Sequence, residues 1–283
     1  MLGHRFWIES AQQHDTWVTV HGRSADVPQL PGIDRARIID SIDVLENGRL
    51  EEALRRARPD VVVNCVGLVK QHESARHAQL AIALNALLPH RLVHLCESAG
   101  ARLVHVSTDC VFSGDIGGYT EESRTDPVDL YGRSKLLGEV AAPHVITVRT
   151  SMVGREMRTQ HGLVEWFLAQ RGTVRGYTRA IFSGLTTGAL SQAILDHVVR
   201  RPDLNGLYHL SAAAISKYDV LVLLNEAYHH GVVIEPYAEV ALDRSLDSTR
   251  FRRATGYTPP SWTSMIETMA HDDLPYERWR AAA

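Results

Sequence analysis

The chain has 283 residues, of which 45% are hydrophobic and 22% are charged, so it is long enough for one large globular domain and a smaller one. Its formal net charge of −3, without any basic run, argues against nucleic acid or an anionic membrane surface as the main partner. No apolar run approaches the roughly 18 residues of a membrane span, and charge appears early in the chain, so we expect a cytoplasmic protein.

Short β-branched runs alternate with longer helical patterns through the first 150 residues, which predicts βα units and a parallel sheet in an α/β fold. The expected strands lie at 16–20, 37–40, 60–67, 101–107 and 145–149. The expected helices lie at 49–58, 75–99 and 131–141.

Beyond residue 150 the pattern loosens. We expect loops rich in Gly and Arg over 154–184, helices near 190–200 and 217–228, and a short final helix near 262–270. Residues 1–150 are therefore expected to form one domain and residues 151–283 mainly a smaller lobe, with segments near 185–211 packing back on the first domain.

Tyr131 and Lys135 open the helix expected at 131–141, and side chains four residues apart lie on one face of a helix. An ammonium about 4 Å from a phenol stabilises the phenolate by on the order of 4 kcal/mol at an effective dielectric near 20, which lowers the tyrosine pKa. With nine tyrosines and only three lysines (Lys70, Lys135 and Lys217), chance predicts about 0.1 such matches. The spacing favours a proton-transfer pair, with coincidence as the alternative.

Three segments, in this order, resemble the extended short-chain dehydrogenase/reductase superfamily and, within it, the dTDP-4-dehydrorhamnose reductase family. They are Asn64-Cys65-Val66-Gly67, the Ser-Thr-Asp-Cys-Val-Phe-Ser-Gly segment at 107–114, and Tyr131 with Lys135. The second segment is similar to the family's Ser-Thr-Asp-Tyr-Val-Phe-Asp-Gly, from which Cys110 and Ser113 depart. The resemblance implies a Rossmann-type doubly wound parallel sheet over 1–150 with a small C-terminal substrate lobe.

The resemblance also implies a catalytic set. Thr108, at a strand end where open α/β sheets place ligands, would hold the substrate carbonyl oxygen. Tyr131 would give its proton to that oxygen while hydride arrives from a nicotinamide, and Lys135 would hold the ribose hydroxyls and tune the phenol. A turn cap is the alternative role for Thr108.

The cofactor site implied by the resemblance draws on several segments. Its residues would be Leu2, Gly3, Arg23, Ser24, Asp43, Val44, Cys65, Val66, Gly67, Asn85, Tyr131 and Lys135. NAD sites usually carry an acidic residue after the second strand, and Arg23 instead suits a 2′-phosphate, so we favour NADPH over NAD. The alternatives are a bare strand end for Cys65–Gly67, a surface arginine for Arg23, a loop-start aspartate for Asp43 and a solvated polar residue for Asn85.

The family's glycine motif, G-x-x-G-x-x-G after a first strand, is matched only at its end by Met1-Leu2-Gly3. In a doubly wound sheet that strand is central, so its absence would leave its neighbours unpaired and remove a backbone N–H cradle for the pyrophosphate. We expect a start site placed too late, with a short upstream segment missing. A degenerate paralogue that binds no cofactor is the alternative.

A nucleotide-diphosphate sugar is the substrate implied by the resemblance. The expected substrate residues are Thr108, Asp109, Cys110, Arg175, Thr186 and Arg244, with Thr187 and Asp247 in the same regions. Structural salt bridges are the alternative for the arginines.

Two other residue types point to no site. His90 and His94 have helical spacing but no third ligand, so we expect no metal. Cys65, Cys96 and Cys110 form no C-x-x-C pair, which predicts buried free thiols.

The function predicted from this resemblance is NADPH-dependent reduction of a nucleotide-linked 4-keto-6-deoxy sugar for polysaccharide biosynthesis, in a protein that could form a homodimer. One alternative is a sugar-nucleotide epimerase or dehydratase, although a 4,6-dehydratase would carry Asp-Glu where this chain has Asp109-Cys110. The other is a catalytically silent family member that binds a nucleotide or a protein.

Overall fold

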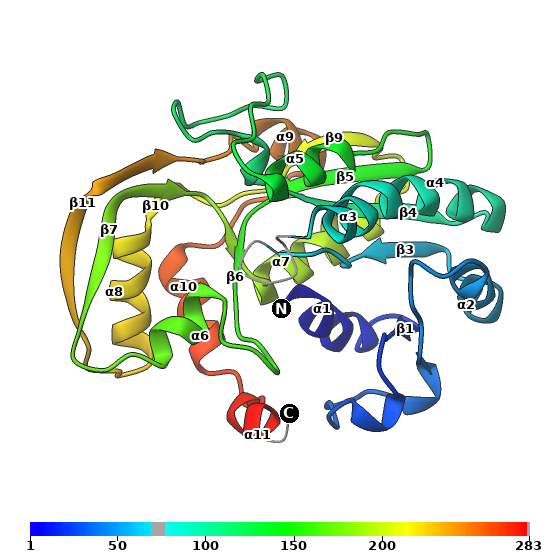
Figure 1. Cartoon of the computed structure of the whole chain (residues 1–283), viewed down its shortest axis with the longest axis horizontal. Helices are drawn as coiled ribbons and strands as arrows, with labels where there is room; N and C mark the ends of the chain where they lie inside the picture. Colours follow the sequence, from blue (N-terminus) through cyan, green and yellow to red (C-terminus); the bar gives the residue numbers. More distant parts are fainter. Residues whose placement is uncertain (70–76, 282–283) are drawn as a thin grey trace.

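The computed structural model describes residues 1–69 and 77–281. Its centre is a four-stranded parallel sheet in the order β3-β4-β5-β9 (Figure 1). These strands are β3 (Val61–Asn64), β4 (Arg102–Thr108), β5 (Val145–Thr150) and β9 (Gly206–His209). The predicted α/β class with a parallel sheet is confirmed.

Much of the rest of the chain is helical. The helices are α1 (Leu2–Ala11), α2 (Arg49–Ala57), α3 (Ala78–Ala81), α4 (Leu88–Ala99), α5 (Leu130–Leu137), α6 (Leu163–Leu168), α7 (Thr187–Ile194), α8 (Lys217–Ala227), α9 (Thr249–Thr255), α10 (Trp262–Ala270) and α11 (Tyr276–Ala281). The remaining strands are β1 (Val18–Thr19), β2 (Ile38–Ile39), β6 (Met152–Val153), β7 (Thr173–Phe182), β8 (Leu185–Thr186), β10 (Ile215–Ser216) and β11 (Val233–Asp243).

Both faces of the central sheet are buried, which explains its nearly continuous apolar strands. Along β4, Val104 and Val106 pack in the core cluster that also holds residues of α1 and α7. Leu103, which directly precedes Val104, packs in a second cluster with residues of α2 and α4. Since successive strand side chains point to opposite faces, one strand joins two cores and sits rigidly between them.

The helix expected at 75–99 is interrupted. Residues 75 and 76 lie outside the described residues, and the described part runs from α3 through a π-helical segment, Ile82–Leu87, into α4. Pro89 explains the interruption, because proline has no N–H to bond the carbonyl four residues earlier, that of Asn85. The irregular segment places Asn85 in the interior, where it is fully buried.

Strands β1 and β2 form a separate two-stranded parallel sheet, with Val18 opposite Ile38. Among the described residues no strand pairing joins this unit to β3. Residues 2–11, which include the end of the expected glycine motif, lie in α1 beside α7 (Figure 1).

The later part of the chain contains more regular structure than the sequence indicates. The prediction of loops at 154–184 is wrong, because α6 and the ten-residue strand β7 occupy much of that stretch. Strand β7 pairs with β10 and β11 in a three-stranded sheet packed on α8. Helices α1, α9 and α11 and strand β11 were also not expected. The division at residue 150 stays a prediction, while β9 lies beside β5 in the central sheet.

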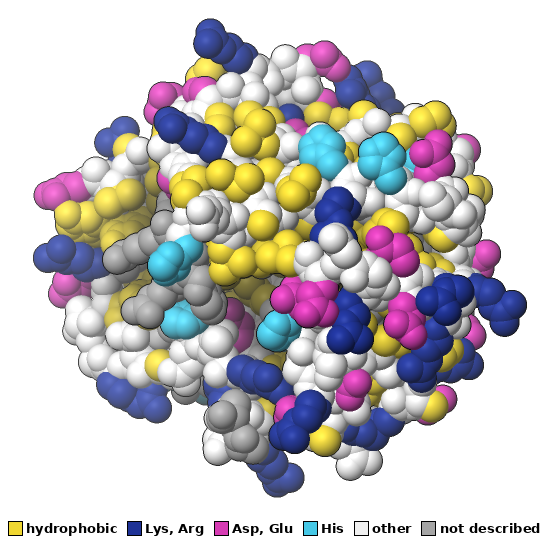
Figure 2. Space-filling view, turned by 45° about the vertical axis from the view of Figure 1, so that its right-hand side comes forward, with side chains coloured by type: hydrophobic (Ala, Val, Ile, Leu, Met, Phe, Trp, Pro, Cys, Tyr) yellow, Lys and Arg dark blue, Asp and Glu magenta, His cyan; other side chains and the backbone are white. Residues whose placement is uncertain are grey.

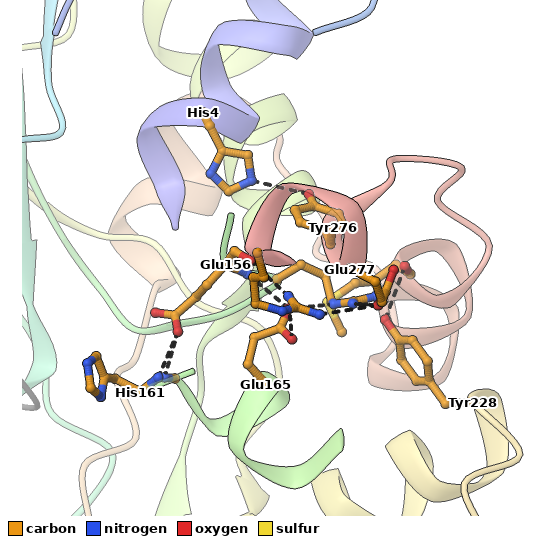
Figure 3. A network of polar contacts seen from close by, with 11 residues as sticks. His4, Glu156, His161, Glu165, Tyr228, Tyr276 and Glu277 are labelled. Atoms are coloured by element: carbon orange, nitrogen blue, oxygen red, sulfur yellow. Dashed lines mark hydrogen bonds and ion pairs between the residues drawn. The ribbon is translucent and has the colours of Figure 1, made fainter. Parts of the chain in front are cut away.

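A buried ion-pair network ties three distant segments together (Figure 3). Glu165 on α6 accepts hydrogen bonds from Arg155 Nε at 2.6 Å and the Glu156 amide at 3.0 Å, and pairs with Arg280 of α11 at 2.7 Å. His4 of α1 hydrogen-bonds the Tyr276 hydroxyl at 3.2 Å. The Glu165 side chain is only 1% exposed, so its charge depends on these partners.

Glu165→Gln is expected to lower the free energy of unfolding by about 3 kcal/mol, because the buried Arg155 and the partly buried Arg280 lose a counter-charge. Urea titration followed by circular dichroism measures this. Glu267→Gln, at an exposed position of α10, is the matched control and should change stability by no more than about 0.5 kcal/mol. Equal stability of the two variants would contradict the argument.

Candidate functional site

The three residues expected to be catalytic lie together at the carboxyl end of β4. Thr108 is the last residue of that strand, and Tyr131 and Lys135 both lie on α5. The side chain of Asp129 caps α5 by accepting a hydrogen bond from the Gly132 amide at 2.8 Å. The helix therefore begins at Leu130 and includes both Tyr131 and Lys135. The Thr108 hydroxyl hydrogen-bonds the Tyr131 phenol, so these two side chains share one site.

Lys135 is held beside the same strand. Its side chain is buried, and Nζ donates to the Val106 carbonyl oxygen at 2.7 Å, two residues before Thr108. Helix α5 ends at Leu137, earlier than the residue 141 expected, because Gly138 ends it. A Cβ on Gly138 would lie 1.9 Å from the Asn85 carbonyl oxygen, so only glycine permits this close approach.

The charges in the site differ from those expected from spacing alone. Burial raises the pKa of Tyr131, and the hydrogen bond from Thr108 only partly opposes this effect. Burial lowers the pKa of Lys135 to about 8, opposed by Glu139 and Cys65. The expected lowering of the tyrosine pKa by the lysine is therefore not reached, because burial of the phenol dominates and the ammonium is bound to a backbone carbonyl.

Three expected substrate residues gather next to Thr108. The Thr108 hydroxyl accepts from the Cys110 amide at 3.1 Å, which is the turn-cap role held open for it. Arg244 donates from Nε to the Phe112 carbonyl at 2.9 Å and from Nη1 to Cys110 Sγ at 3.6 Å. Burial raises the pKa of Asp109, and the positive charge of Arg244 opposes that rise. The end of β4 thus places one cation, Arg244, and one buried carboxyl group, Asp109, near the phenol of Tyr131.

The turn after β3 is shaped by two buried asparagines. Asn64 accepts from the Val66 amide at 3.0 Å and donates to His105 Nδ1 at 3.1 Å. Asn85 accepts from the Leu68 amide at 2.8 Å and donates to Ser134 Oγ of α5 at 3.1 Å. The solvated alternative for Asn85 is therefore wrong, and the turn is fixed directly to the helix that carries Lys135.

Other expected cofactor residues have their contacts elsewhere. The Arg23 side chain is 78% exposed and pairs with Asp26 at 3.3 Å, and the Ser24 amide donates to Asp40. Asp43 accepts from the Leu45 amide at 2.9 Å, which is the loop-start role considered for it, and Val44 packs at the edge of the second core. Figure 1 shows this β1–β2 unit on the other side of β3 from α5.

Leu2 and Gly3 lie in the first turn of α1. Leu2 is buried in the main core, and a Cβ on Gly3 would lie 3.6 Å from Cys65 Cβ. The structure thus brings Gly3 beside the turn after β3, whereas the remainder of a glycine-rich loop is absent from the described residues.

The more distant substrate residues are spread over other elements. Arg175, on β7, lies over the Tyr237 ring at 4.8 Å. Thr186 caps α7, and Asp247 accepts from the Thr249 amide. Thr186 and Thr187 line a cavity of about 360 Å³ between α1, α7 and α10, which includes neither Thr108 nor Tyr131 in its lining.

Sequence reasoning missed several side chains that support the site. Glu139 pairs with Arg149 through both carboxylate oxygens, at 2.8 and 2.7 Å, and also accepts from Ser107 at 2.7 Å. The spacing of Glu139 from Lys135, four residues, is a signal that could have found it. Arg149 and Ser107 could not be linked to it from local pattern.

No group of three or more His, Cys, Asp or Glu residues within 1–69 and 77–281 is placed to hold a metal ion. His90 instead donates to the Leu137 carbonyl at 2.9 Å. The three cysteines are free, as predicted, although only Cys96 is fully buried and Cys65 and Cys110 are half-buried. Burial raises the pKa of Cys65 to about 12, so its thiol is uncharged at neutral pH.

The surface carries charges of both signs. Figure 2 shows basic and acidic side chains interspersed over one face, as the small net charge leads us to expect. Across the described part of the chain, no helix combines the length and the apolar character that crossing a bilayer requires.

Comparison with known proteins gives a consistent picture. A family model described as the RmlD substrate binding domain matches residues 9–274. The dTDP-4-dehydrorhamnose reductase of Mycobacterium tuberculosis H37Rv is 38% identical over 120 residues, 39% of each chain. That of Salmonella typhimurium LT2 is 29% identical over 195 residues, 65% of each chain. The aligned chain thus spans less than two thirds of the length of these relatives.

A solved structure shares the architecture. The dTDP-4-dehydrorhamnose reductase of Bacillus anthracis, in complex with NADP, superposes with a TM-score of 0.71 at 22% identity, covering 82% of this chain and 88% of that one. The likeness confirms a Rossmann-type fold.

Proposed function

The chain belongs to the RmlD substrate binding domain family, and from this premise we propose that it reduces a nucleotide-linked 4-keto-6-deoxy sugar with NADPH. The observation that carries the proposal is the meeting of Thr108, Tyr131 and Lys135 at the carboxyl end of β4. The reductase names of the Mycobacterium and Salmonella relatives support it.

The residues of this chain divide the proposed chemistry among them. A nicotinamide cofactor, when bound, supplies the hydride. The Thr108 hydroxyl orients the substrate carbonyl oxygen toward Tyr131. Because burial raises its pKa, Tyr131 stays protonated and can donate its proton to that oxygen as negative charge develops there. The Lys135 ammonium then stabilises the phenolate that remains.

The described residues fit the cofactor in part. The turn at Cys65, Val66 and Gly67 would pass close to the cofactor. Gly67 lets this turn lie against Asn85, because a Cβ there would come within 3.3 Å of Asn85 Oδ1. Lys135 would hold the ribose hydroxyls, and its buried ammonium is already aligned beside β4. Gly3 beside Cys65 would face the same region.

NADPH is proposed over NAD because of Arg23. Its guanidinium is exposed after β1, where it could bind a 2′-phosphate in place of its present partner Asp26. The NADP complex of the Bacillus anthracis structure is in keeping with this choice. Asp43 and Val44 would contact the adenine.

The proposed substrate is recognised by two groups of residues. Asp109, Cys110 and Arg244 would contact the sugar or its diphosphate beside the phenol. Arg175 on β7 and Thr186 at the start of α7 would contact the nucleotide. Dehydration is disfavoured, because a 4,6-dehydratase would be expected to carry glutamate after Asp109 and this chain has Cys110.

The test is NADPH consumption, followed by absorbance, with dTDP-4-keto-6-deoxyhexose as substrate, alongside quenching of NADPH fluorescence on binding. Turnover is expected with the keto sugar and NADPH, at a lower rate with NADH. Binding of NADPH without reduction of any keto sugar would overturn the reductase and favour a nucleotide-binding family member. The absence of both binding and turnover would overturn the cofactor assignment as well.

The rate of reduction is expected to fall above about pH 8. Lys135 has a pKa near 8, lowered by burial, so it is charged below that pH and loses its charge as pH rises through it. Reduction should therefore decline by about tenfold per pH unit well above pH 8, because the neutral amine cannot stabilise the phenolate. A kcat/KM profile between pH 6 and 10 measures this. A profile flat to pH 10 would show that the charge of Lys135 is not needed.

A further inference from the structure

Glu139 occupies an unusual place beside the proposed site. It follows Gly138, just beyond the end of α5, and its side chain is only 12% exposed. Its carboxylate accepts two hydrogen bonds from the Arg149 guanidinium, at 2.8 and 2.7 Å, and a third from Ser107 Oγ at 2.7 Å. Bidentate pairing with a third donor holds a carboxylate in one orientation.

The partners of Glu139 lie directly opposite each other in the sheet. Ser107 of β4 pairs in register with Arg149 of β5. The Arg149 guanidinium lies 5.2 Å from the Phe112 ring centroid and donates to His209 Nε2 at 3.3 Å, while His209 Nδ1 donates to the Tyr119 carbonyl at 3.0 Å. Arg149 is thus fixed on three sides, and Glu139 bridges two adjacent strands through it.

Lys135 and Glu139 bind consecutive residues of β4. The Lys135 ammonium donates to the carbonyl of Val106, and the Glu139 carboxylate accepts from the side chain of Ser107. Thr108 is the next residue of the strand. The two side chains therefore attach the end of α5 to the strand immediately before Thr108, which sets the distance between Thr108 and Tyr131.

The charged and titratable groups around Lys135 are few. Glu139 and Cys65 favour its charged form, against the effect of burial. Cys65 is an uncharged thiol at neutral pH. His105, on β4, is kept neutral by burial and by the charge of Lys135, and Tyr131 on the same helix stays protonated. Of these four neighbours, Glu139 is the one with a carboxyl side chain, and it is held by Arg149.

We propose that Glu139 is a positioning residue: held by Arg149 and Ser107, it fixes α5 against β4 and sets the electrostatic surroundings of Lys135. Its effect on turnover rests on the proposed function, but its effect on Lys135 does not. Glu139 touches neither substrate nor cofactor in this role and acts through Lys135.

The charge of Lys135 can be measured without turnover, because the chain has only three lysines. Protein labelled with ¹³C-lysine gives three Cε signals, which Lys70→Arg and Lys217→Arg variants assign. Titration of these signals in wild type and Glu139→Gln compares the pKa of Lys135 directly. The variant is expected to lower that pKa by about one pH unit, because it removes a nearby negative charge without changing shape.

Glu165→Gln is the matched control. Glu165 is also a buried glutamate bound by an arginine, Arg155, but it lies in the network of α6 and α11. This variant should lose stability without moving the Lys135 titration. Glu139→Asp, which keeps the charge, should restore most of the wild-type pKa, and it also serves if Glu139→Gln does not fold. An unmoved Lys135 titration in Glu139→Gln, an equal shift in Glu165→Gln, or a pKa in Glu139→Asp as low as in Glu139→Gln would each overturn the proposal. If Glu139→Asp folds and Glu139→Gln does not, a Lys135 pKa in Glu139→Asp that is lower than in wild type by a full pH unit would also overturn the proposal.

Turnover adds a second readout. In Glu139→Gln the decline of kcat/KM at high pH should begin about one pH unit lower than in wild type. If wild type reduces no keto sugar, the proposed function fails while the lysine titration still decides the role of Glu139. If wild type is active and the Lys135 titration is the same in both proteins, the positioning role fails and the proposed function stands.

Discussion

Tyr131→Phe is expected to lower kcat for reduction of the keto sugar by about 10²–10⁴-fold, the range typical of a lost general acid. Phenylalanine keeps the ring that packs beside Thr108 and removes only the proton donor. The raised pKa of Tyr131 keeps its phenol protonated at neutral pH, so the side chain carries the proton that reduction of the ketone requires. Steady-state NADPH oxidation at saturating substrate measures the loss.

Tyr177→Phe provides the matched control for this variant. Tyr177 lies on β7, where its ring is exposed and packs against Tyr237. Removing its hydroxyl should leave kcat unchanged, and both variants should quench NADPH fluorescence as wild type does. A Tyr131→Phe enzyme that keeps kcat within about threefold of wild type would remove Tyr131 from the acid role.

Gly138→Ala is expected to destabilise the protein by about 4 kcal/mol, or to prevent its folding. The added Cβ would lie 1.9 Å from the Asn85 carbonyl oxygen and 3.0 Å from its carbonyl carbon, and both are backbone atoms that cannot rotate away. Asn85 is itself held by Leu68 and Ser134, so it cannot yield without moving the turn after β3. Urea unfolding followed by circular dichroism measures the change.

Gly22→Ala tests whether any glycine would give the same result. No heavy atom lies within 4 Å of a Cβ placed on Gly22, and its backbone conformation suits an ordinary residue. This variant should stay within about 0.5 kcal/mol of wild type. Equal stability of Gly138→Ala and wild type would mean that α5 and the π-helical segment can separate at little cost.

Local pattern was sufficient for the elements that carry the proposed catalysis. Strands β4 and β5 are short apolar runs that end in polar residues. Helix α10, outside the site, was also predicted with its observed bounds. The cap at Asp129 lies directly before the motif and starts α5 at Leu130. These features depend on neighbours within a few residues, so the sequence displays them directly.

The charge state of the site depends on neighbours far along the chain. The partners of Glu139 are 32 and 10 residues away, and the carbonyl that binds Lys135 is 29 residues away. Helical spacing placed Tyr131 and Lys135 on one face but could not reveal that burial would act on each of them more strongly than the other's charge. Desolvation is a property of the assembled core, and no local window contains it.

The missed strands have a similar explanation. Strand β7 contains Gly176 and two arginines, a composition that reads as a loop, yet it pairs with β11 about 60 residues later. Residues of β7 are supported by that partner and by α8 rather than by their own propensity. Pro89 marks the interrupted helix in the sequence, but the burial of Asn85 in the π-helical segment before it depends on contacts with Ser134, 49 residues away.

The link between α1 and α11 bears on how the protein is made. His4 and Tyr276 hydrogen-bond across a separation of 272 residues, and Arg5 also pairs with Asp272. A chain emerging from the ribosome has no partner for the side chains of His4 and Arg5 until residues 272–276 have been synthesised. Contacts this distant slow the search for the native state, so Trp7 and Ile8 of α1 stay uncovered by Tyr276 and Trp279 until that segment has been made.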